Sequence, residues 1–294
     1  MASTTKIMTS LIVSEYIEKE GDKEITVTSE MVSVEGSALG LRAGDKITLN
    51  ALMYGMLLAS GNDAANTSAI GVAGSIDEFL ILMNQKAKDL NLNSTNFMTP
   101  SGLDGEKHYS TARDMAVLTS YALQNELFKS IVALKDANIE YYSKEKNEKI
   151  IVKLSNHNKL LSMMEGCIGV KTGYTKKSGR CLVSAREDDE SLLITVTFNA
   201  PDDWNDHIYL YNEALSRKRY YKVQNKIIKI KTADGNTKFL CPQNNQDICL
   251  FTKASVKEKI YLPRIIYNEN LDDCGKILFE INGKIIETRN LKYN

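Results

Sequence analysis

Three short motifs carry the residues of this chain that could do chemistry. They are Ser-Thr-Thr-Lys at residues 3–6, Ser-Gly-Asn at residues 60–62 and Lys-Thr-Gly at residues 171–173. Each motif alone is weak, because such combinations are common on helix surfaces, in turns and at strand ends. The ordered set is more specific, since its members begin 57 and then 111 residues apart and fall at a helix start, an inter-helix turn and a strand end. Together they predict acyl transfer by a serine that a lysine activates.

The first motif offers a nucleophile and a base. Ser3 and Lys6 are three residues apart, which on a helix places both side chains on one face. A serine hydroxyl is a weak nucleophile until a neighbouring base takes its proton, so we assign Ser3 as the nucleophile and Lys6 as the general base. This role requires the Lys6 pKa to fall from about 10.4 toward neutrality. Burial, the positive end of the helix and a second cation, Lys171, would each lower it.

The second motif offers a proton relay and an amide. We expect Ser60 to pass a proton between the bases and the leaving amine. We expect Asn62 to hold Lys6 through its side-chain oxygen and to donate its amide hydrogens to the substrate carbonyl. Both residues lie in a turn between two predicted helices, which suits side chains that must point into a cleft.

The third motif offers a place for a peptide substrate. Lys171 and Thr172 fall on a predicted strand that ends in Gly173, whose missing side chain would let a peptide lie against the backbone. A terminal carboxylate needs a cation and a hydroxyl donor, and Lys171 with Thr172 or Thr175 offers both. We therefore predict that this strand binds the substrate.

Hydrophobic periodicity predicts helices that position the first two motifs. Apolar residues recur at helical spacing from Ser3 to the stop at Gly21, and again in a helix that Asn50 would cap. Further helices are predicted after Asp63, after Ser75, which has capping-box spacing with Glu78, and over residues 111–124. Residues 25–50 read as loop and small hairpin.

The second half of the chain changes to a β pattern. Extended runs are predicted at residues 150–154, 168–171, 180–185 and 192–198, followed by a helix over residues 204–215. Beyond residue 221 the chain is β-rich, and Asp-Gly at 234–235 and Asn-Gly at 282–283 are hairpin signals.

These patterns predict an α+β fold. It comprises a helical lobe beside an antiparallel sheet flanked by helices, and then a small all-β domain. We place the boundary between residues 1–220 and 221–294.

Composition excludes several classes of protein. The chain has 294 residues, with 37 basic and 37 acidic side chains, so it lacks the excess of positive charge that nucleic-acid binding requires. No apolar run is long enough to span a membrane. The five cysteines show no metal-binding spacing, and an odd number leaves at least one thiol unpaired. We expect buried apolar thiols rather than a disulfide framework.

Beyond the triplets, several longer stretches match a known family. They are residues 1–9, 36–41, 57–65, 100–104, 108–114 and 169–175. The sequence resembles the low-molecular-mass penicillin-binding proteins that are serine D-alanyl-D-alanine carboxypeptidases, with a β-lactamase/penicillin-binding transpeptidase-like fold, over about residues 1–217. Asn-Ala-Pro-Asp-Asp-Trp at residues 199–204 is similar to members from Gram-positive bacteria.

The resemblance implies removal of the terminal D-alanine from peptidoglycan stem peptides through an acyl-Ser3 intermediate. It implies that β-lactams acylate the same serine, that the Ser3 and Tyr174 backbone N–H groups bind the oxyanion, and that no metal and no cofactor take part. Family members act outside the cytoplasm, in the cell envelope. The histidines at 108, 157 and 207 receive no catalytic role, and we expect them to be structural.

Both ends of the chain depart from the family pattern. Family members carry a signal peptide and two strands before the Ser-x-x-Lys helix, and many end in an amphipathic membrane anchor. We expect Met1 to be an internal methionine of a longer protein whose first strands are missing here. We therefore also expect low activity from residues 1–294 alone.

Two other functions compete with a carboxypeptidase. A class A β-lactamase would carry a Glu-x-x-Leu-Asn motif between the second and third triplets, and residues 63–170 contain none. A truncated, non-catalytic peptidoglycan-binding protein would have no need to keep Ser3, Lys6 and Lys171 together. Slow release of bound penicillin would separate a carboxypeptidase from the first alternative, and a Ser3→Ala variant with unchanged effect would favour the second.

Overall fold

The computed structural model describes residues 1–188, 191–223, 227–232, 235–262 and 274–293. The chain divides into two compact units, Met1–Tyr211 and Asn212–Asn294. The first unit contains all three motifs. Each unit has its own core, and we describe them separately.

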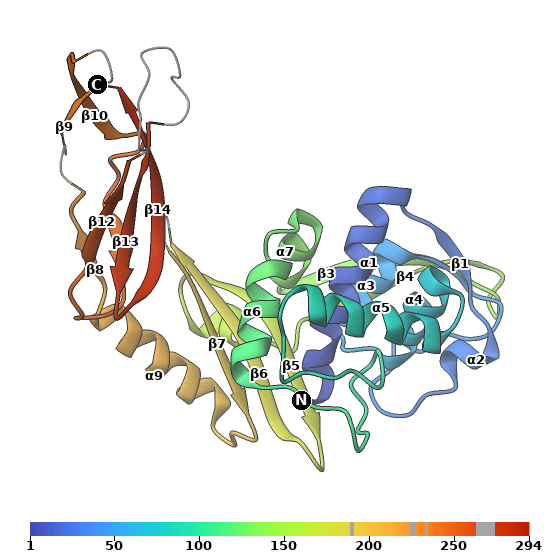
Figure 1. Ribbon diagram of the computed structural model, residues 1–294. Coiled ribbons are helices and arrows are strands. Elements are labelled where there is room, and N and C mark those ends of the chain that lie inside the picture. Colours follow the sequence, from blue (N-terminus) through green and yellow to red (C-terminus); the bar gives the residue numbers. More distant parts are fainter. Residues whose placement is uncertain (189–190, 224–226, 233–234, 263–273, 294) are drawn as a thin grey trace. The chain divides into compact units, whose positions relative to one another are not determined.

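Helices make up most of the first part of unit one (Figure 1). A short 3₁₀ turn, η1 (Ala2–Thr5), leads directly into α1 (Lys6–Glu20), which Gly21 ends with a positive φ. The further helices are α2 (Ser29–Val32), α3 (Leu49–Leu57), α4 (Asn62–Ala73), α5 (Ile76–Asp89), α6 (Ala112–Ala122), α7 (Glu126–Val132), α8 (Leu160–Met163) and α9 (Asp203–Ser216).

Helix α1 is the centre of the core. Its first nine residues, from Lys6 to Ser14, are all buried, so this stretch is enclosed on every side rather than amphipathic. Ile7, Met8 and Leu11 join side chains from α3, α4, α5, α6 and α7 in one apolar cluster. The helix that carries the first motif is therefore fixed by packing around its whole circumference.

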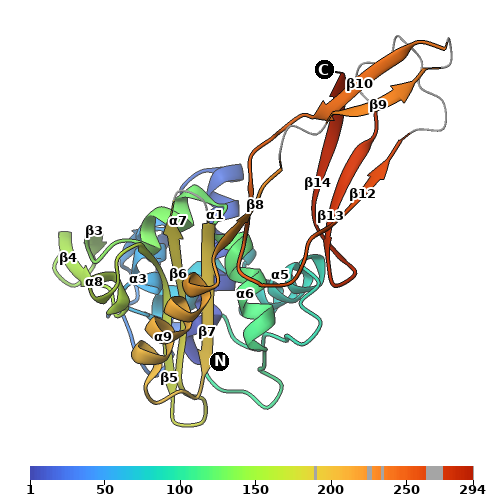
Figure 2. The ribbon, with the colours of Figure 1, turned by 90° about the vertical axis from the view of Figure 1, so that its left-hand side faces the viewer.

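A three-stranded antiparallel sheet lies beside this core. Its order is β5 (Cys167–Thr175), β6 (Gly179–Asp188) and β7 (Ser191–Phe198), as predicted from the β-rich runs. On β6, Val183 and Ala185 point into the main core, whereas Ser184 between them bonds to α9. Figure 2 shows α9 and α6 on opposite sides of this sheet. The predicted arrangement of a helical lobe beside a helix-covered antiparallel sheet is confirmed.

A second sheet contains a strand that the sequence analysis assigned to the first. The run at residues 150–154 lies in β4 (Glu148–Ser155), which pairs with β3 (Asp136–Ser143) in a separate four-stranded sheet, β1-β2-β3-β4. Strands β1 (Glu24–Thr26) and β2 (Lys46–Thr48) form the expected small hairpin, with α2 in the connection between them. The β pattern identified β4 as a strand but gave no information about its partner.

Local capping signals were right at one helix and wrong at another. Ser75 is the N-cap of α5, and its hydroxyl accepts from the Glu78 N–H at 3.2 Å, as predicted. Helix α3 begins earlier than expected, because Thr48 rather than Asn50 is its N-cap and accepts from the Ala51 N–H. Threonine and asparagine are both good N-caps, so position alone did not decide between them.

The second unit is β-rich, as predicted. Its larger sheet has the order β12-β13-β14-β10-β9, and a smaller one pairs β11 with β8. Asn282-Gly283 forms the turn between β13 and β14, and β9 pairs with β10 around Gly235, whereas Asp234 lies outside the described residues. The strands are β8 (Arg219–Tyr221), β9 (Ile228–Lys231), β10 (Thr237–Pro242), β11 (Ile248–Leu250), β12 (Lys257–Tyr261), β13 (Lys276–Ile281) and β14 (Lys284–Tyr293).

Two further observations bear on composition. Cys181, Cys241 and Cys274 are buried, as expected of apolar thiols. Among the described residues, no helix combines the length and the apolar character that crossing a membrane requires.

Candidate active site

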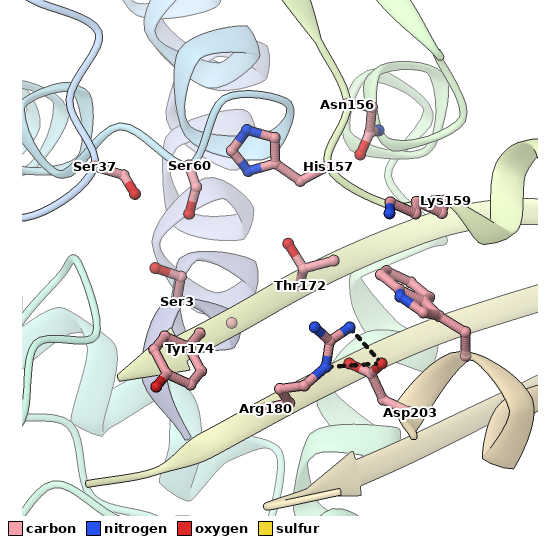
Figure 3. Close-up of a pocket in the computed structure, with 12 residues that line it drawn as sticks. Ser3, Ser37, Ser60, Asn156, His157, Lys159, Thr172, Tyr174, Arg180 and Asp203 are labelled. Carbon is pink, nitrogen blue, oxygen red and sulfur yellow. Dashed lines mark hydrogen bonds and ion pairs between the residues drawn. The ribbon is translucent and has the colours of Figure 1, made fainter. Parts of the chain in front are cut away.

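The three motifs meet at one place in the first unit. Turn η1 with the start of α1 brings Ser3 and Lys6, and β5 brings the Lys-Thr-Gly motif. Ser60 lies in the turn before α4, and Asn62 is the first residue of that helix. Figure 3 shows Ser3, Ser60 and Thr172 around a common opening. The structure thus brings together residues that are up to 170 positions apart in the sequence.

Lys6 makes three short contacts that define its chemistry. Its Nζ lies 2.7 Å from Asn62 Oδ1, 2.6 Å from the Ser101 carbonyl oxygen and 2.9 Å from Ser3 Oγ. The first two oxygens can only accept, so each must take a hydrogen from Nζ. A neutral amine has two hydrogens and one lone pair, and in that state the lone pair points at the Ser3 hydroxyl. This is the geometry of a base that accepts the Ser3 proton.

Burial and a second cation favour this neutral state. Lys6 is 0% exposed, and burial is the largest influence that holds its pKa well below the ordinary value, followed by the positive charge of Lys171. The carboxylate of Asp63 acts in the opposite direction. Lys171 is itself 1% exposed, and burial lowers its pKa to about 7. The predicted second cation is therefore present, and it acts on Lys6 through space.

Asn62 forms hydrogen bonds to both Lys6 and the backbone of Glu35. Its Oδ1 accepts from Lys6, and its Nδ2 donates to the Glu35 carbonyl oxygen at 2.7 Å. One of the two Nδ2 hydrogens is therefore already used within the protein, which leaves one for a substrate carbonyl.

Asp63 is a positioning residue that the sequence analysis did not identify. Its carboxylate accepts from the backbone N–H groups of Leu39 and Gly40, each at 2.8 Å, and of Leu41 at 3.1 Å. It also accepts from the Ala64 N–H at the start of α4. These bonds fix the family-like stretch at residues 36–41 beside Asn62. An aspartate in the first turn of a helix gave only the ordinary helix-start signal.

Ser60 has a backbone conformation that is unusual for a residue with a side chain. Its φ is +62°, in the left-handed region, and its side chain is buried at the edge of the cavity. Such conformations cost free energy and persist where surrounding contacts enforce them. The bend directs the Ser60 hydroxyl toward the opening that Ser3 and Thr172 share (Figure 3).

Strand β5 approaches the nucleophile closely because Gly173 has no side chain. A Cβ on Gly173 would lie 3.0 Å from the Ser3 backbone nitrogen and 3.1 Å from the Thr4 nitrogen. The sequence analysis explained this glycine by contact with the substrate, but the structure uses it first for contact between β5 and η1. As a result, the N–H groups at Ser3 and Tyr174 belong to adjoining segments.

The other residues of β5 to which the sequence analysis gave a role lie in different environments. Tyr174 is 66% exposed and lines the cavity, as does Thr172. Lys171 lies behind the cavity wall, where its ammonium donates to the Thr172 carbonyl oxygen at 3.1 Å. Thr175 does not line the cavity, because its hydroxyl accepts from the Ser178 N–H in the turn after β5.

The cavity itself extends well beyond the three motifs. Its volume is about 570 Å³, and Ser3 and Ser60 form one part of its wall. Lining residues that the sequence analysis did not predict are Ser37, Asn156, His157, Lys159, Arg180, Asp203 and Trp204. Asp203 and Trp204 fall within a stretch that matched the family, but no spacing rule pointed to their side chains.

The three histidines lie in different places. His108 Nδ1 accepts from the Met98 N–H at 3.0 Å, so Nε2 carries the ring hydrogen and donates to Thr5 Oγ1 at 2.9 Å. His207 is a buried residue of α9, and its ring lies between the hydroxyls of Ser184 and Thr197. Burial is the main cause that lowers the pKa of both rings to about 4. His157 differs, because it lines the cavity.

Comparison with known proteins places this site in a family context. Residues 1–202 match the family Peptidase_S11, described as D-alanyl-D-alanine carboxypeptidase. The D-alanyl-D-alanine carboxypeptidase DacF of Bacillus subtilis is 33% identical over 97% of this chain and 76% of its own length. The enzyme DacB2 of Mycobacterium tuberculosis is 36% identical over 63% of this chain and 61% of its own length.

Solved structures show the same similarity. The D-alanyl-D-alanine carboxypeptidase DacD from Francisella tularensis aligns with a TM-score of 0.72 and 25% identity, over 99% of this chain and 86% of that one. The DD-transpeptidase of Streptomyces K15 aligns with a TM-score of 0.68 and 30% identity, over 72% of this chain and 86% of that one.

Proposed function

This chain belongs to the peptidase S11 family of D-alanyl-D-alanine carboxypeptidases, serine-type hydrolases of the cell wall, and on that premise we propose that it removes the terminal D-alanine from peptidoglycan stem peptides through an acyl-Ser3 intermediate. The observation that carries this proposal is the contact set of Lys6, whose two obligatory acceptors leave its lone pair for the Ser3 hydroxyl.

In the acylation step, neutral Lys6 takes the proton of Ser3 as Oγ attacks the carbonyl of the penultimate D-alanine. The negative charge that develops on the carbonyl oxygen is bound by the backbone N–H groups of Ser3 and Tyr174. Such donors are typically worth about 10²- to 10³-fold in rate each. Gly173 sets the spacing of the two donors, because it lets β5 approach η1.

Collapse of the tetrahedral intermediate requires a proton on the leaving amine. Ser60 lines the same cavity as Ser3. We assign it the transfer to the amine of the proton that Lys6 took from Ser3, which returns Lys6 to its neutral form. D-alanine leaves, and the stem peptide remains as an ester on Ser3. Water then attacks this ester with Lys6 again as base, which regenerates the free serine.

We propose the cell envelope as the place of action, because the substrate class is found there. β-Lactams are proposed inhibitors that acylate Ser3 and leave slowly. The two competing functions are not favoured: the named relatives are carboxypeptidases or a transpeptidase, and residues 63–170 lack the glutamate motif of a class A β-lactamase.

Mass spectrometry of the intact protein after incubation with benzylpenicillin tests the proposal. We expect one equivalent of adduct, located on the tryptic peptide of residues 1–6, and none with Ser3→Ala. Ser37→Ala is the matched control, because Ser37 is another serine of the same cavity, and its adduct on Ser3 should persist. Release of D-alanine from an L-lysyl-D-alanyl-D-alanine peptide should be lost in parallel. An adduct that persists in Ser3→Ala, or a folded wild type with neither adduct nor D-alanine release, would contradict the proposal.

A further inference from the structure

The two units of the chain have opposite net charge. Residues 212–294 carry 16 basic and 9 acidic side chains, whereas residues 1–211 carry 21 basic and 28 acidic ones. The neutral total of the chain therefore combines a basic second unit with an acidic first unit. Such an asymmetry indicates that the basic part binds a partner of opposite charge.

The larger sheet of the second unit buries one of its two faces. Ile277, Leu240 and Leu291 are 0% exposed and belong to the apolar cores of this unit, to which β8 and β11 also contribute. Ile277 pairs with Arg289, which is two residues before Leu291. Leu291 pairs with Pro242, which is two residues after Leu240. Residues that are opposite each other or two apart on a strand share a face, so these side chains define the inner face.

The opposite face of the same sheet carries lysines, and we call it the lysine face. Its lysines alternate along the strands with inner-face residues, and all of them are exposed. They are Lys257 and Lys259 on β12, Lys276 on β13, Lys292 on β14, and Lys229 and Lys231 on β9. The acidic Glu280 on this face is 9% exposed, and its carboxylate accepts from Lys259. The exposed charge of the face is therefore positive.

The lysines of this face follow one diagonal line across the sheet. Lys259 pairs with Leu278, which is two residues from Lys276. Lys276 pairs with Asn290, which is two residues from Lys292. Each step thus moves one strand sideways and two residues along, a distance of about 7 to 8 Å. The line begins at the β12 edge of the sheet and reaches β14 in regular steps.

The line continues across β10 to the other edge of the sheet. Lys292 pairs with Cys241, which is two residues from Phe239. Phe239, an exposed residue, pairs with Lys229, and Lys231 follows on β9. From regular strand spacings, the step from Lys292 to Lys229 is about 12 Å, and the whole line is about 40 Å long. In Figure 1, β9 and β10 extend the length of this sheet beyond β12 and β13.

A single line of cations fits a linear polyanion better than a flat anionic surface. A bilayer presents its phosphates in two dimensions, so cations that face it gain nothing from lying in single file. In a polymer with phosphodiester links, each repeat carries one negative charge, and flexible polyol units let the phosphates adjust to unequal steps. Lysine binds phosphate as a point charge and needs no fixed geometry. Because the relatives are cell-wall enzymes, a polymer of the wall is the partner that the setting supplies.

We propose that the lysine face of the second unit binds a linear, phosphodiester-linked polyol polymer of the cell wall along this diagonal line. The attraction is electrostatic and releases counterions, so the affinity falls steeply with salt. None of the six lysines lines the cavity that contains Ser3. The proposal therefore goes beyond the carboxypeptidase function and concerns how the enzyme is retained at the wall.

The test measures binding of the full chain to fluorescently labelled poly(glycerol phosphate), by anisotropy at several NaCl concentrations. A line variant carries Lys229→Gln, Lys276→Gln and Lys292→Gln. A control variant loses the same charge from exposed lysines of the same unit that lie off the line, through Lys222→Gln, Lys253→Gln and Lys284→Gln. The two variants thus have equal net charge and differ only in where the charge is lost.

We expect the line variant to bind the polymer at least about tenfold more weakly than the wild type at about 0.1 M NaCl. The slope of log K against log salt should become smaller by about 2, because three phosphate contacts are lost. The control variant should stay within about threefold of the wild type. Monomeric glycerol phosphate at the same phosphate concentration should not compete, because the contacts along the line require a continuous chain.

Two measurements keep this test separate from folding and from the proposed function. Both variants should match the wild type in urea unfolding, because the replaced lysines are exposed. Both should also release D-alanine from a soluble L-lysyl-D-alanyl-D-alanine peptide at the wild-type rate. A chain without peptidase activity would contradict the proposed function and leave the polymer titration readable.

Four outcomes would overturn the inference. The first is a wild type that does not bind the polymer at about 0.1 M NaCl. The second is an equal loss of affinity in the line and control variants, which would show attraction by net charge alone. The third is full competition by the monomer. The fourth is binding of the wild type to phosphatidylglycerol vesicles but not to the polymer, which would assign the face to a membrane.

Discussion

The two faces of the β5-β6-β7 sheet each bury a polar cluster, and the clusters differ in charge. On one face, Lys6 and Lys171 are both buried, and within the described ranges their hydrogen-bond partners are neutral oxygens. On the other face, His207 is buried with hydroxyl partners. Its ring nitrogens lie 2.7 Å from Ser184 Oγ and 3.0 Å from Thr197 Oγ1.

The difference distinguishes buried polar groups that take part in the reaction from buried polar groups that stabilise the fold. The histidine cluster is neutral and its ring nitrogens are paired, so it gains the hydrogen bonds of a dry interior at little cost. The lysine cluster keeps two like charges out of water, which is unfavourable unless one of them gives up its proton. A pair of buried, unpaired cations beside a cavity is therefore the stronger indication of a functional site.

The largest expected effect comes from Lys6. A Lys6→Met variant removes the base but keeps the volume, and we expect the rate of acylation by benzylpenicillin to fall by at least about 10³-fold. Because Asn62 Oδ1 and the Ser101 carbonyl oxygen lose their buried donor, stability should also fall, by about 1 to 3 kcal/mol. Rapid-quench mass spectrometry and urea unfolding measure the two quantities. A folded Lys6→Met protein that reacts within tenfold of the wild type would contradict the role of Lys6 as base.

A smaller, pH-dependent effect is expected from Lys171. Its positive charge lowers the pKa of Lys6, so in Lys171→Met the pKa of Lys6 should rise. The acid limb of the profile of acylation rate against pH should then move to higher pH, because more alkaline solution is needed to produce neutral Lys6. Lys159→Met, which removes a lysine from the cavity wall, is the matched control and should leave the limb in place. An unmoved limb in Lys171→Met would show that the two lysines are not coupled.

A change at His207, on the other face of the sheet, should have the smallest effect on the acylation rate but a clear effect on the stability of the folded protein. The pKa of His207 is about 4 in the folded protein, against 6.5 ordinarily. Between these values the unfolded chain binds more protons, so His207 makes stability fall as the pH drops from 6.5 toward 4. The effect is on the order of 3 kcal/mol at most. His207→Gln should reduce this loss of stability at acid pH and leave the acylation rate at pH 7 unchanged.

His108→Gln provides the contrast within this experiment. The pKa of His108 is also about 4, so His108→Gln should reduce the loss of stability at acid pH by a similar amount. However, His108 donates to Thr5, two residues from the nucleophile, so acylation should slow by a few-fold as well. Urea unfolding at pH 4.5 and 7 and acylation rates at pH 7 distinguish the two variants. Equal slowing in both would remove the distinction between the two faces.

The sequence was informative where chemistry restricts the choice of residue. Motif spacing located Ser3, Lys6 and Lys171, and β-rich runs separated by polar turns located the strands of the three-stranded sheet. Strand β3 was missed because it begins with Asp136 and polar neighbours, and α7 because it is only seven residues long. Strand pairing also depends on contacts between distant residues, which a local pattern does not record.

The further residues of the cavity were beyond sequence reasoning for the same reason. Arg180 acquires its position from the register of β6 against β5, and Asp203 from the packing of α9 on that sheet. Asp63 acts through its bonds to the backbone of residues 39–41, where side-chain identity leaves no pattern. Only the fold brings these groups together.

The close contact between Gly173 and the Ser3 backbone has a consequence for the order of folding. The two residues are 170 positions apart, so the contact closes one of the longest loops in the first unit. Contacts of such high sequence separation slow folding. A refolding chain with α1 and its helical neighbours in place, but β5 not yet docked on η1, would have the serine and the lysine but only one of the two oxyanion donors, because the Tyr174 N–H lies on β5. Reactivity toward penicillin should therefore return in the slowest refolding phase of this unit, after its helical circular dichroism.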